Sequence, residues 1–186
     1  EVATARKEDY DPGSRKPTVI ASTVEEDMSR RDFTINAIAA SILPDTFGEL
    51  YDPFGGLKDL QKGLIITPLD PDDTFSDDPL RMLRAVRFAA QLQYEVAATA
   101  LESISRNVKR IKIISWERIR DEIIKSLKTD KPSIAFYLMK ETRLLAHIFP
   151  ELDGMSGIDV ISGKGHKDVF VHTLQVVDNA AQLSPI

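Results

Sequence analysis

The sequence predicts an α+β chain that is mostly helical, because its residue pattern changes near position 68. Before that position, short β-like runs at 1–6, 48–51 and 64–67 are separated by turn residues, most clearly at 52–56. Apolar residues recur at helical spacing over 32–41, which predicts one helix among these strands. Beyond position 68 the whole pattern is helical. We therefore expect short strands with one helix, followed by a helical region.

Start signals predict three helices in the second region. Pro79 suits the first position of a helix, with Asp78 as its N-cap. Ser115 is expected to cap a helix over 115–128, and a third helix is expected over 132–141. The residues expected on the buried side of the first of these helices are Leu80, Leu83, Ala89 and Leu92.

Composition places the chain among ordinary globular proteins and excludes several classes of site. Of its 186 residues, 42% are apolar and 28% are charged. No apolar run approaches the roughly 18 residues that a membrane span needs, so no membrane partner is expected. The chain has no cysteine, which excludes disulfides and thiolate metal sites. The first residues do not have the layout of a signal peptide, so we expect a cytoplasmic location.

Charge is unevenly distributed along the chain. The net charge of −5 argues against a nonspecific polyanion binder, yet basic residues gather beyond position 105. They form either a surface for RNA phosphates or a solvated helix face. This basic stretch consists of Arg106, Lys109, Arg110, Lys112, Arg118 and Arg120.

The first candidate site is the segment 30–38, Arg-Arg-Asp-Phe-Thr-Ile-Asn-Ala-Ile. On a helix that begins near Asp32, Asn36 lies one turn further along the same face. A carboxylate beside an amide suits the hydroxyls of a ribose, because both accept and the amide also donates. Arg30 and Arg31 precede the expected helix N-terminus, where guanidinium groups bind phosphate oxygens in pairs. The alternative is that Asp32 only caps the helix and the arginines are solvated.

The second candidate site is Asp78 with Arg81, three residues apart and therefore neighbours at the first turn of the predicted helix. The carboxylate accepts and the guanidinium donates. Cytosine and adenine present an amino donor beside a ring-nitrogen acceptor, whereas guanine and uracil present the reverse, so one such pair selects C and A. A wrong base leaves buried polar groups unpaired. The alternative is an N-cap with an intrahelical ion pair.

Four segments resemble, in this order, the class II tRNA nucleotidyltransferases, which are the CCA-adding enzymes, with the bacterial poly(A) polymerases as close relatives. They are 30–38, 52–60, 77–89 and 117–122. The resemblance implies a template-independent nucleotidyltransferase that adds C and A from CTP and ATP to the 3′ end of tRNA, with Mg²⁺. A poly(A) polymerase, or an enzyme that adds only CC or only A, is an alternative. A non-catalytic module that binds RNA or nucleotide is another. No oligomeric state follows from the sequence.

The same resemblance implies a division into three parts and roles for particular residues. Residues 1–67 are expected to be the later part of a nucleotidyltransferase head, 68–152 a helical neck that binds RNA and nucleotide, and 153–186 a linker with the first helix of an HD-like domain. The implied roles are the ribose for Asp32 and Asn36, phosphate for Arg31, the base for Asp78 and Arg81, further nucleotide contact for Arg84, and support from Asp77, Glu117 and Arg118. Asp77 stands where the family usually has Glu.

Metal ligands are the part of the family pattern that this sequence does not repeat. The family's metals bind a Gly-Ser … Asp-x-Asp pattern, and the pairs at 9–11 and 70–72 have its spacing but lie among turn residues. Glu1 resembles the remnant of a third acid. His172 would be the first ligand of an HD metal-phosphohydrolase domain, but the chain has no His-Asp dipeptide, so we expect no metal site within it. We therefore expect a truncated piece of an enzyme.

Because two-metal phosphoryl transfer requires those carboxylates, we predict that the purified 186-residue chain adds no nucleotide to tRNA with any divalent metal. Incubation with a tRNA that lacks its CCA end and labelled CTP should leave no label in the RNA. Incorporation of labelled CMP would refute this expectation.

Overall fold

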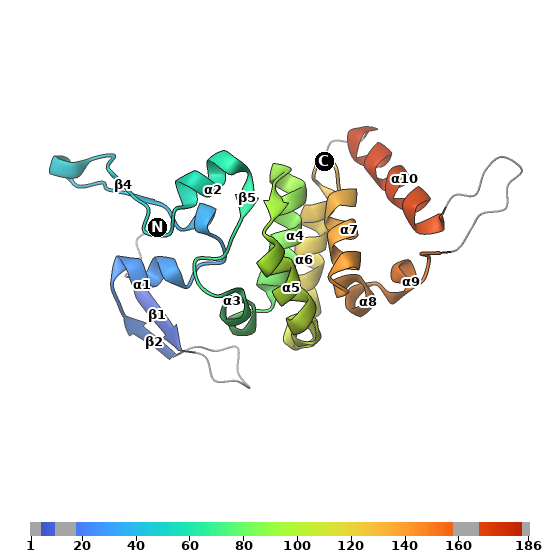
Figure 1. Ribbon diagram of the computed structural model, residues 1–186, viewed down its shortest axis with the longest axis horizontal. Helices are drawn as coiled ribbons and strands as arrows, with labels where there is room; N and C mark the ends of the chain where they lie inside the picture. Colours follow the sequence, from blue (N-terminus) through green and yellow to red (C-terminus); the bar gives the residue numbers. More distant parts are fainter. Residues whose placement is uncertain (1–4, 10–17, 158–167, 184–186) are drawn as a thin grey trace, which may run out of the picture.

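The structure, a computed structural model, describes residues 5–9, 18–157 and 168–183. Its short strands lie at one end, and its helices follow one another along the long axis (Figure 1). This confirms the α+β, mostly helical fold expected from the sequence. No helix within these ranges is both long and apolar enough to cross a membrane.

The strands form three two-stranded sheets within the described ranges. In chain order they are β1 (Arg6–Asp9), β2 (Thr18–Ala21), β3 (Ala39–Ala40), β4 (Leu50–Tyr51), β5 (Leu64–Ile65) and β6 (Glu95–Val96). The pairs β1–β2 and β3–β4 are antiparallel, whereas β5 and β6 are parallel. The strands expected at 48–51 and 64–67 are confirmed in shorter form. The expectation of helix alone beyond position 68 is wrong at β6, which joins the strand-rich end.

The helix expected over 32–41 is also wrong, and the helix of this region lies earlier, at α1 (Val24–Ser29). Thr23 and Glu26 form a capping box, in which each side chain accepts a hydrogen bond from the other residue's N–H. The box satisfies N–H groups of the first turn and sets the helix start at Val24, six residues before Arg30. The arginines therefore follow a helix C-terminus.

After α1 the chain forms only a short 3₁₀ turn, η1 (Thr34–Asn36), which packs on α2 (Gly56–Lys62). A Cβ at Gly56 would lie 2.1 Å from the carbonyl oxygen of Thr34, so only glycine permits this close approach. The Thr34 hydroxyl also donates to Oδ2 of buried Asp59 at 2.7 Å. These tertiary contacts fix the turn, and helical spacing in the sequence does not reveal them.

Further helices follow η1 in the described part of the chain. They are η2 (Pro44–Thr46), α3 (Pro71–Asp77), α4 (Leu80–Leu92), α5 (Ala98–Asn107), η3 (Val108–Ile113), α6 (Trp116–Leu127), α7 (Ser133–Glu141), α8 (Leu144–Ile148), α9 (Pro150–Asp153) and α10 (Val169–Leu183). The helices expected at 115–128 and 132–141 are confirmed as α6 and α7. Ser115 is the N-cap of α6 by position, but its hydroxyl accepts no capping hydrogen bond.

Helix α4 lies in the middle of the helical region, packed against α6 and α7 (Figure 1). It begins one residue later than expected, because Pro79 is its N-cap, while Oδ1 of Asp78 accepts from the Leu80 N–H at 3.1 Å. Leu80, Leu83 and Ala89 are buried as expected. Leu92 is 37% exposed, contrary to expectation, because it is the last residue before the left-handed turn that ends the helix.

A buried ion pair joins α4 to α6. Nε of Arg87 lies 2.6 Å from Oε2 of Glu122, and the two side chains are only 7% and 4% exposed. Nζ of Lys125 reaches the other carboxylate oxygen at 2.9 Å. Burial by itself would raise the pKa of Glu122, but hydrogen bonds from Lys125 and Arg87 outweigh it and hold that pKa below its usual value.

Helix α10 packs on α7, although the sequence between them is long. Phe170 and Leu174 are buried in the same apolar core as the neighbouring helices. The ring of Phe170 contacts Tyr137 edge to face, with centroids 5.8 Å apart. Oδ1 of Asp178 accepts from the Ser133 N–H at 2.8 Å, at the start of α7.

Glu122→Gln should destabilise the chain by about 3–5 kcal/mol, because it leaves the buried Arg87 charge uncompensated. Because the folded-state pKa of Glu122 is lowered, its contribution is fully present above its ordinary pKa of about 4.5 and is lost as the pH falls through the lower folded value. Urea unfolding at pH 7 and at acid pH measures both effects. Asp121→Asn is the control, because this exposed neighbour pairs with exposed Arg120; it should change stability by about 0–1 kcal/mol. Equal effects of the two variants would contradict the prediction.

Candidate nucleotide site

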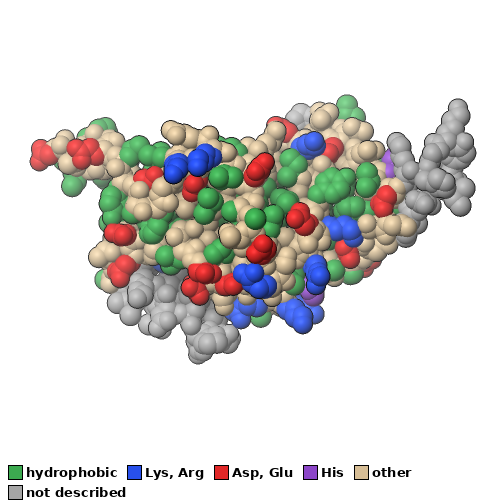
Figure 2. Space-filling view, in the orientation of Figure 1, with side chains coloured by type: hydrophobic (Ala, Val, Ile, Leu, Met, Phe, Trp, Pro, Cys, Tyr) green, Lys and Arg blue, Asp and Glu red, His purple; other side chains and the backbone are tan. Residues whose placement is uncertain are grey.

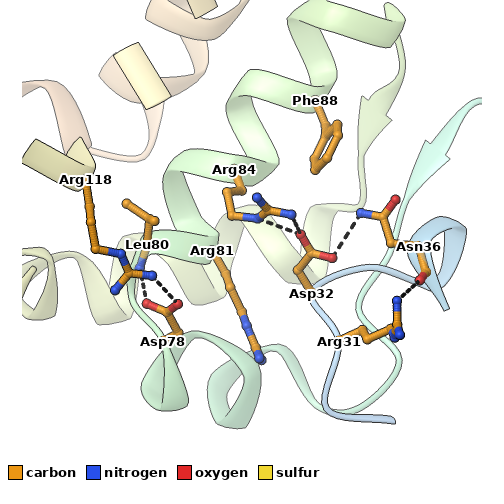
Figure 3. A pocket seen from close by; sticks show the side chains of 9 residues that line it. All are labelled: Arg31, Asp32, Asn36, Asp78, Leu80, Arg81, Arg84, Phe88 and Arg118. Atoms are coloured by element: carbon orange, nitrogen blue, oxygen red, sulfur yellow. Dashed lines mark hydrogen bonds and ion pairs between the residues drawn. The ribbon is translucent and has the colours of Figure 1, made fainter. Parts of the chain in front are cut away.

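A cavity of about 510 Å³ opens where the strand-rich end meets α4 and α6 (Figure 3). Its lining residues are Arg31, Asp32, Asn36, Asp78, Leu80, Arg81, Arg84, Phe88 and Arg118. The structure therefore brings together, in one cavity, both motifs singled out in the sequence. We call it the first cavity.

Asp32 lies at the centre of the hydrogen bonds in the first cavity and is only 8% exposed. Its Oδ1 accepts from the amide of Asn36 at 3.0 Å and from the Phe33 N–H at 2.9 Å. Its Oδ2 pairs with Arg84, whose Nη2 and Nε lie 2.5 and 2.7 Å away. Asn36 is thus beside Asp32 as expected, although a 3₁₀ turn rather than an α-helix places it there.

Arg31 reaches the first cavity from the end of α1. Its guanidinium donates to the Asn36 carbonyl oxygen at 3.3 Å and pairs with Asp27 at 3.4 Å, and its side chain is 50% exposed. The expectation that a helix N-terminus beside Arg30 and Arg31 attracts phosphate is wrong, because both arginines follow the C-terminus of α1. Any attraction for anions at this edge therefore comes from the guanidinium groups themselves.

Asp78 and Arg81 line the same cavity but do not pair with each other, so the intrahelical ion pair considered as an alternative is wrong. Oδ2 of Asp78 pairs with Arg118 of α6 at 2.9 Å. Arg81 donates to the carbonyl oxygens of Arg30 and Thr74. Asp78 does support the helix start through Leu80, so the capping alternative is correct in that respect. Both side chains keep unused hydrogen-bonding capacity.

Of the remaining expected residues, Arg84 and Arg118 line the first cavity and two others do not. Glu117 is exposed on α6, and Asp77 is exposed at the end of α3. Sequence reasoning missed Phe88, one helical turn beyond Arg84 and thus on the same face of α4.

The basic stretch is partly engaged within the protein. Arg106 pairs with Asp72 at 2.9 Å, and Arg110 donates to the Ser76 carbonyl oxygen at 2.8 Å. Lys109 and Lys112 are exposed. Hydrogen bonds from Ser103, Arg106 and Asn107 hold the pKa of Asp72 below its usual value, the Ser103 bond most strongly. On the face shown in Figure 2, acidic side chains lie among the basic ones.

The described residues contain no group of three or more His, Asp or Glu side chains that could hold a metal ion. Asp70 caps α3 by accepting from the Asp72 N–H at 2.8 Å. Glu1 lies outside the described ranges, as does part of the pair at 9–11. His172 is exposed on α10. The Mg²⁺ that the resemblance implies therefore has no ligand set among the described residues.

Two family models match this chain. One is described as "Poly A polymerase head domain" and matches residues 1–66, and the other as "Probable RNA and SrmB- binding site of polymerase A" and matches residues 93–155. The multifunctional CCA protein of Nitrosomonas europaea is 38% identical over 162 residues, which cover 86% of this chain and 38% of that protein.

Solved structures of tRNA-processing enzymes share this fold. A CCA-adding enzyme in an apo form superposes with a TM-score of 0.72 at 34% identity, over 81% of this chain and 37% of that one. A tRNA-processing enzyme with CTP superposes with a TM-score of 0.63 at 31% identity, over 77% of this chain and 37% of that one. A tRNA nucleotidyltransferase complexed with a primer tRNA and an incoming ATP analogue superposes with a TM-score of 0.65 at 32% identity. The match covers 74% of this chain and 42% of that one.

The chain is thus homologous to CCA-adding nucleotidyltransferases. More narrowly, it belongs to the class II CCA-adding enzyme and poly(A) polymerase family. It spans 38% of the length of the curated relative described above.

Proposed function

We propose that the first cavity binds a nucleoside triphosphate and selects its base, as part of an enzyme that adds C and A from CTP and ATP to the 3′ end of tRNA. The observation that carries the proposal is the convergence of Asp78 and Arg81 with Asp32, Asn36 and Arg31 on one cavity. The related structures with CTP and with an ATP analogue and a primer tRNA support the choice of substrates and partner.

Base selection is assigned to Asp78 and Arg81. Arg118 and the Leu80 N–H hold the Asp78 carboxylate in place while leaving lone pairs free. The two carbonyl oxygens bonded to Arg81 use only part of its five N–H donors. A fixed acceptor and a fixed donor match the edge that cytosine and adenine share.

Ribose and phosphate binding are assigned to the other end of the first cavity. Asp32 is already bonded to Arg84 and Asn36, so a ribose hydroxyl would share this carboxylate with them. Arg31 is half-exposed beside them, where a triphosphate can reach its guanidinium. Mg²⁺ would supply charge neutralisation in such a reaction. The supporting roles of Asp77 and Glu117 remain predictions.

A poly(A) polymerase is the second candidate, favoured by the description of the head model. The two candidates differ in the nucleotides that the first cavity accepts. Isothermal titration of the 186-residue chain with the four nucleotides separates them, because a CCA-adding enzyme should bind both CTP and ATP, and a poly(A) polymerase should prefer ATP alone. Binding of none of the four would count against both.

Asp32→Ala should weaken CTP and ATP binding about equally, by roughly 1–3 kcal/mol, because ribose and triphosphate are common to both nucleotides and a charged hydrogen-bond partner is lost. Isothermal titration with each nucleotide measures the effect. A variant that weakened one nucleotide much more than the other would show that Asp32 reads the base.

Asp78→Ala or Arg81→Ala should reduce the preference for CTP and ATP over GTP and UTP by about 1–3 kcal/mol, the range of a good base-edge contact. The fold should survive, since losing a helix cap costs about 1 kcal/mol. Dissociation constants for all four nucleotides, measured with the melting temperature, test this. Asp73→Ala, an exposed acid on α3 outside the first cavity, is the matched control. If the Asp78 variant is destabilised but keeps its preference for CTP and ATP over GTP and UTP, then Asp78 acts only as a helix cap.

A further inference from the structure

A second cavity of about 450 Å³ lies on the adjoining face of α4, toward the end of α6. Its lining residues are Arg87, Gln91, Lys125, Lys128, Thr129 and Asp130. None of them lines the first cavity. We call it the second cavity.

The second cavity carries an excess of positive charge. Arg87 and Lys125 share one carboxylate, that of buried Glu122. Lys128 is exposed and forms no ion pair with the residues that the structure describes. Asp130 is the one acidic residue in the lining. The cations Arg87, Lys125 and Lys128 thus outnumber the two carboxylates, those of Glu122 and Asp130. Exposed Lys128 is available to an anion.

The two cavities share a wall. Arg84 and Phe88 face the first cavity, while Arg87 and Gln91 face the second, and each pair lies one turn apart on α4. The Arg87 guanidinium lies over the Phe88 ring, 3.9 Å from its centroid, and also donates to Gln91. The second cavity therefore adjoins the first across the contact of Arg87 with Phe88.

We propose that the second cavity binds a phosphate of the RNA strand whose 3′ end lies at the first cavity. This rests on the proposed function. In the basic stretch, Arg106 and Arg110 are already held by Asp72 and the Ser76 carbonyl, which leaves Lys109 and Lys112 as exposed cations there. The lysine side chains supply mobile point charges at the rim, and Arg87 supplies a fixed one at the wall.

Fluorescence anisotropy of the 186-residue chain with a labelled tRNA lacking its CCA end, at several salt concentrations, tests the proposal. Lys128→Gln should weaken binding about five- to eightfold at 0.1 M salt and lower the salt slope by about 0.7–0.9, the effect of one lost phosphate contact. Asp130→Asn should tighten binding by removing a repelling charge. Lys58→Gln removes an exposed lysine on α2 and should change nothing.

Titration with CTP and ATP separates this proposal from the proposed function. Both dissociation constants should be unchanged in the Lys128 variant. An equal loss of nucleotide and RNA affinity would make the second cavity a triphosphate site and overturn the proposal, as would equal effects of Lys128→Gln and Lys58→Gln, or no RNA binding by the unaltered chain. Failure of the base-selection proposal would instead appear in the Asp78 and Arg81 variants, with RNA affinity intact.

Discussion

Both cavities depend on one buried ion pair. Arg87 and Glu122 fix α4 against α6, and α4 carries Arg81, Arg84 and Phe88 on the face that lines the first cavity. A buried pair of this kind contributes little net stability compared with apolar packing, but breaking it is costly. Its main effect is therefore on geometry, since it fixes the rotation of α4 about its own axis relative to α6.

A second contact joins the strand-rich end to the helices. Asp32 follows α1, whereas Arg84 belongs to α4, and their ion pair spans fifty-two positions of sequence. The bond from Arg81 to the Arg30 carbonyl runs in parallel. The first cavity is therefore built from two parts of the chain, and neither part contains it alone.

Much of the helical region could be predicted from the sequence, because its signals are local. Pro79 and Ser115 stand within one residue of observed helix starts. The segment 32–41 could not be predicted in this way. Its apolar spacing suits a helix. The capping box at Thr23 starts a helix earlier, however, and the close approach of Gly56 to Thr34 fixes a short 3₁₀ turn in its place.

The sequence predicts which residues line the candidate site better than it predicts which of them pair with one another. Local reasoning placed Asp78 beside Arg81, because three-residue spacing brings side chains together on a helix. The structure pairs Asp78 with Arg118 of another helix instead, a contact that depends on how α4 and α6 pack. Phe88 was missed for a related reason, since an apolar residue on a helix is usually core, and only the packed structure shows that it lines a cavity.

The contact between Asp178 and Ser133 has a consequence for cooperativity. Helix α7 begins after Pro132 and has no capping side chain of its own, so α10 provides the partner for its first free N–H. Phe170 and Leu174 fill the core beneath it. Helices α7 and α10 therefore form one unit of local unfolding, in which detachment of α10 exposes the start of α7 to solvent exchange.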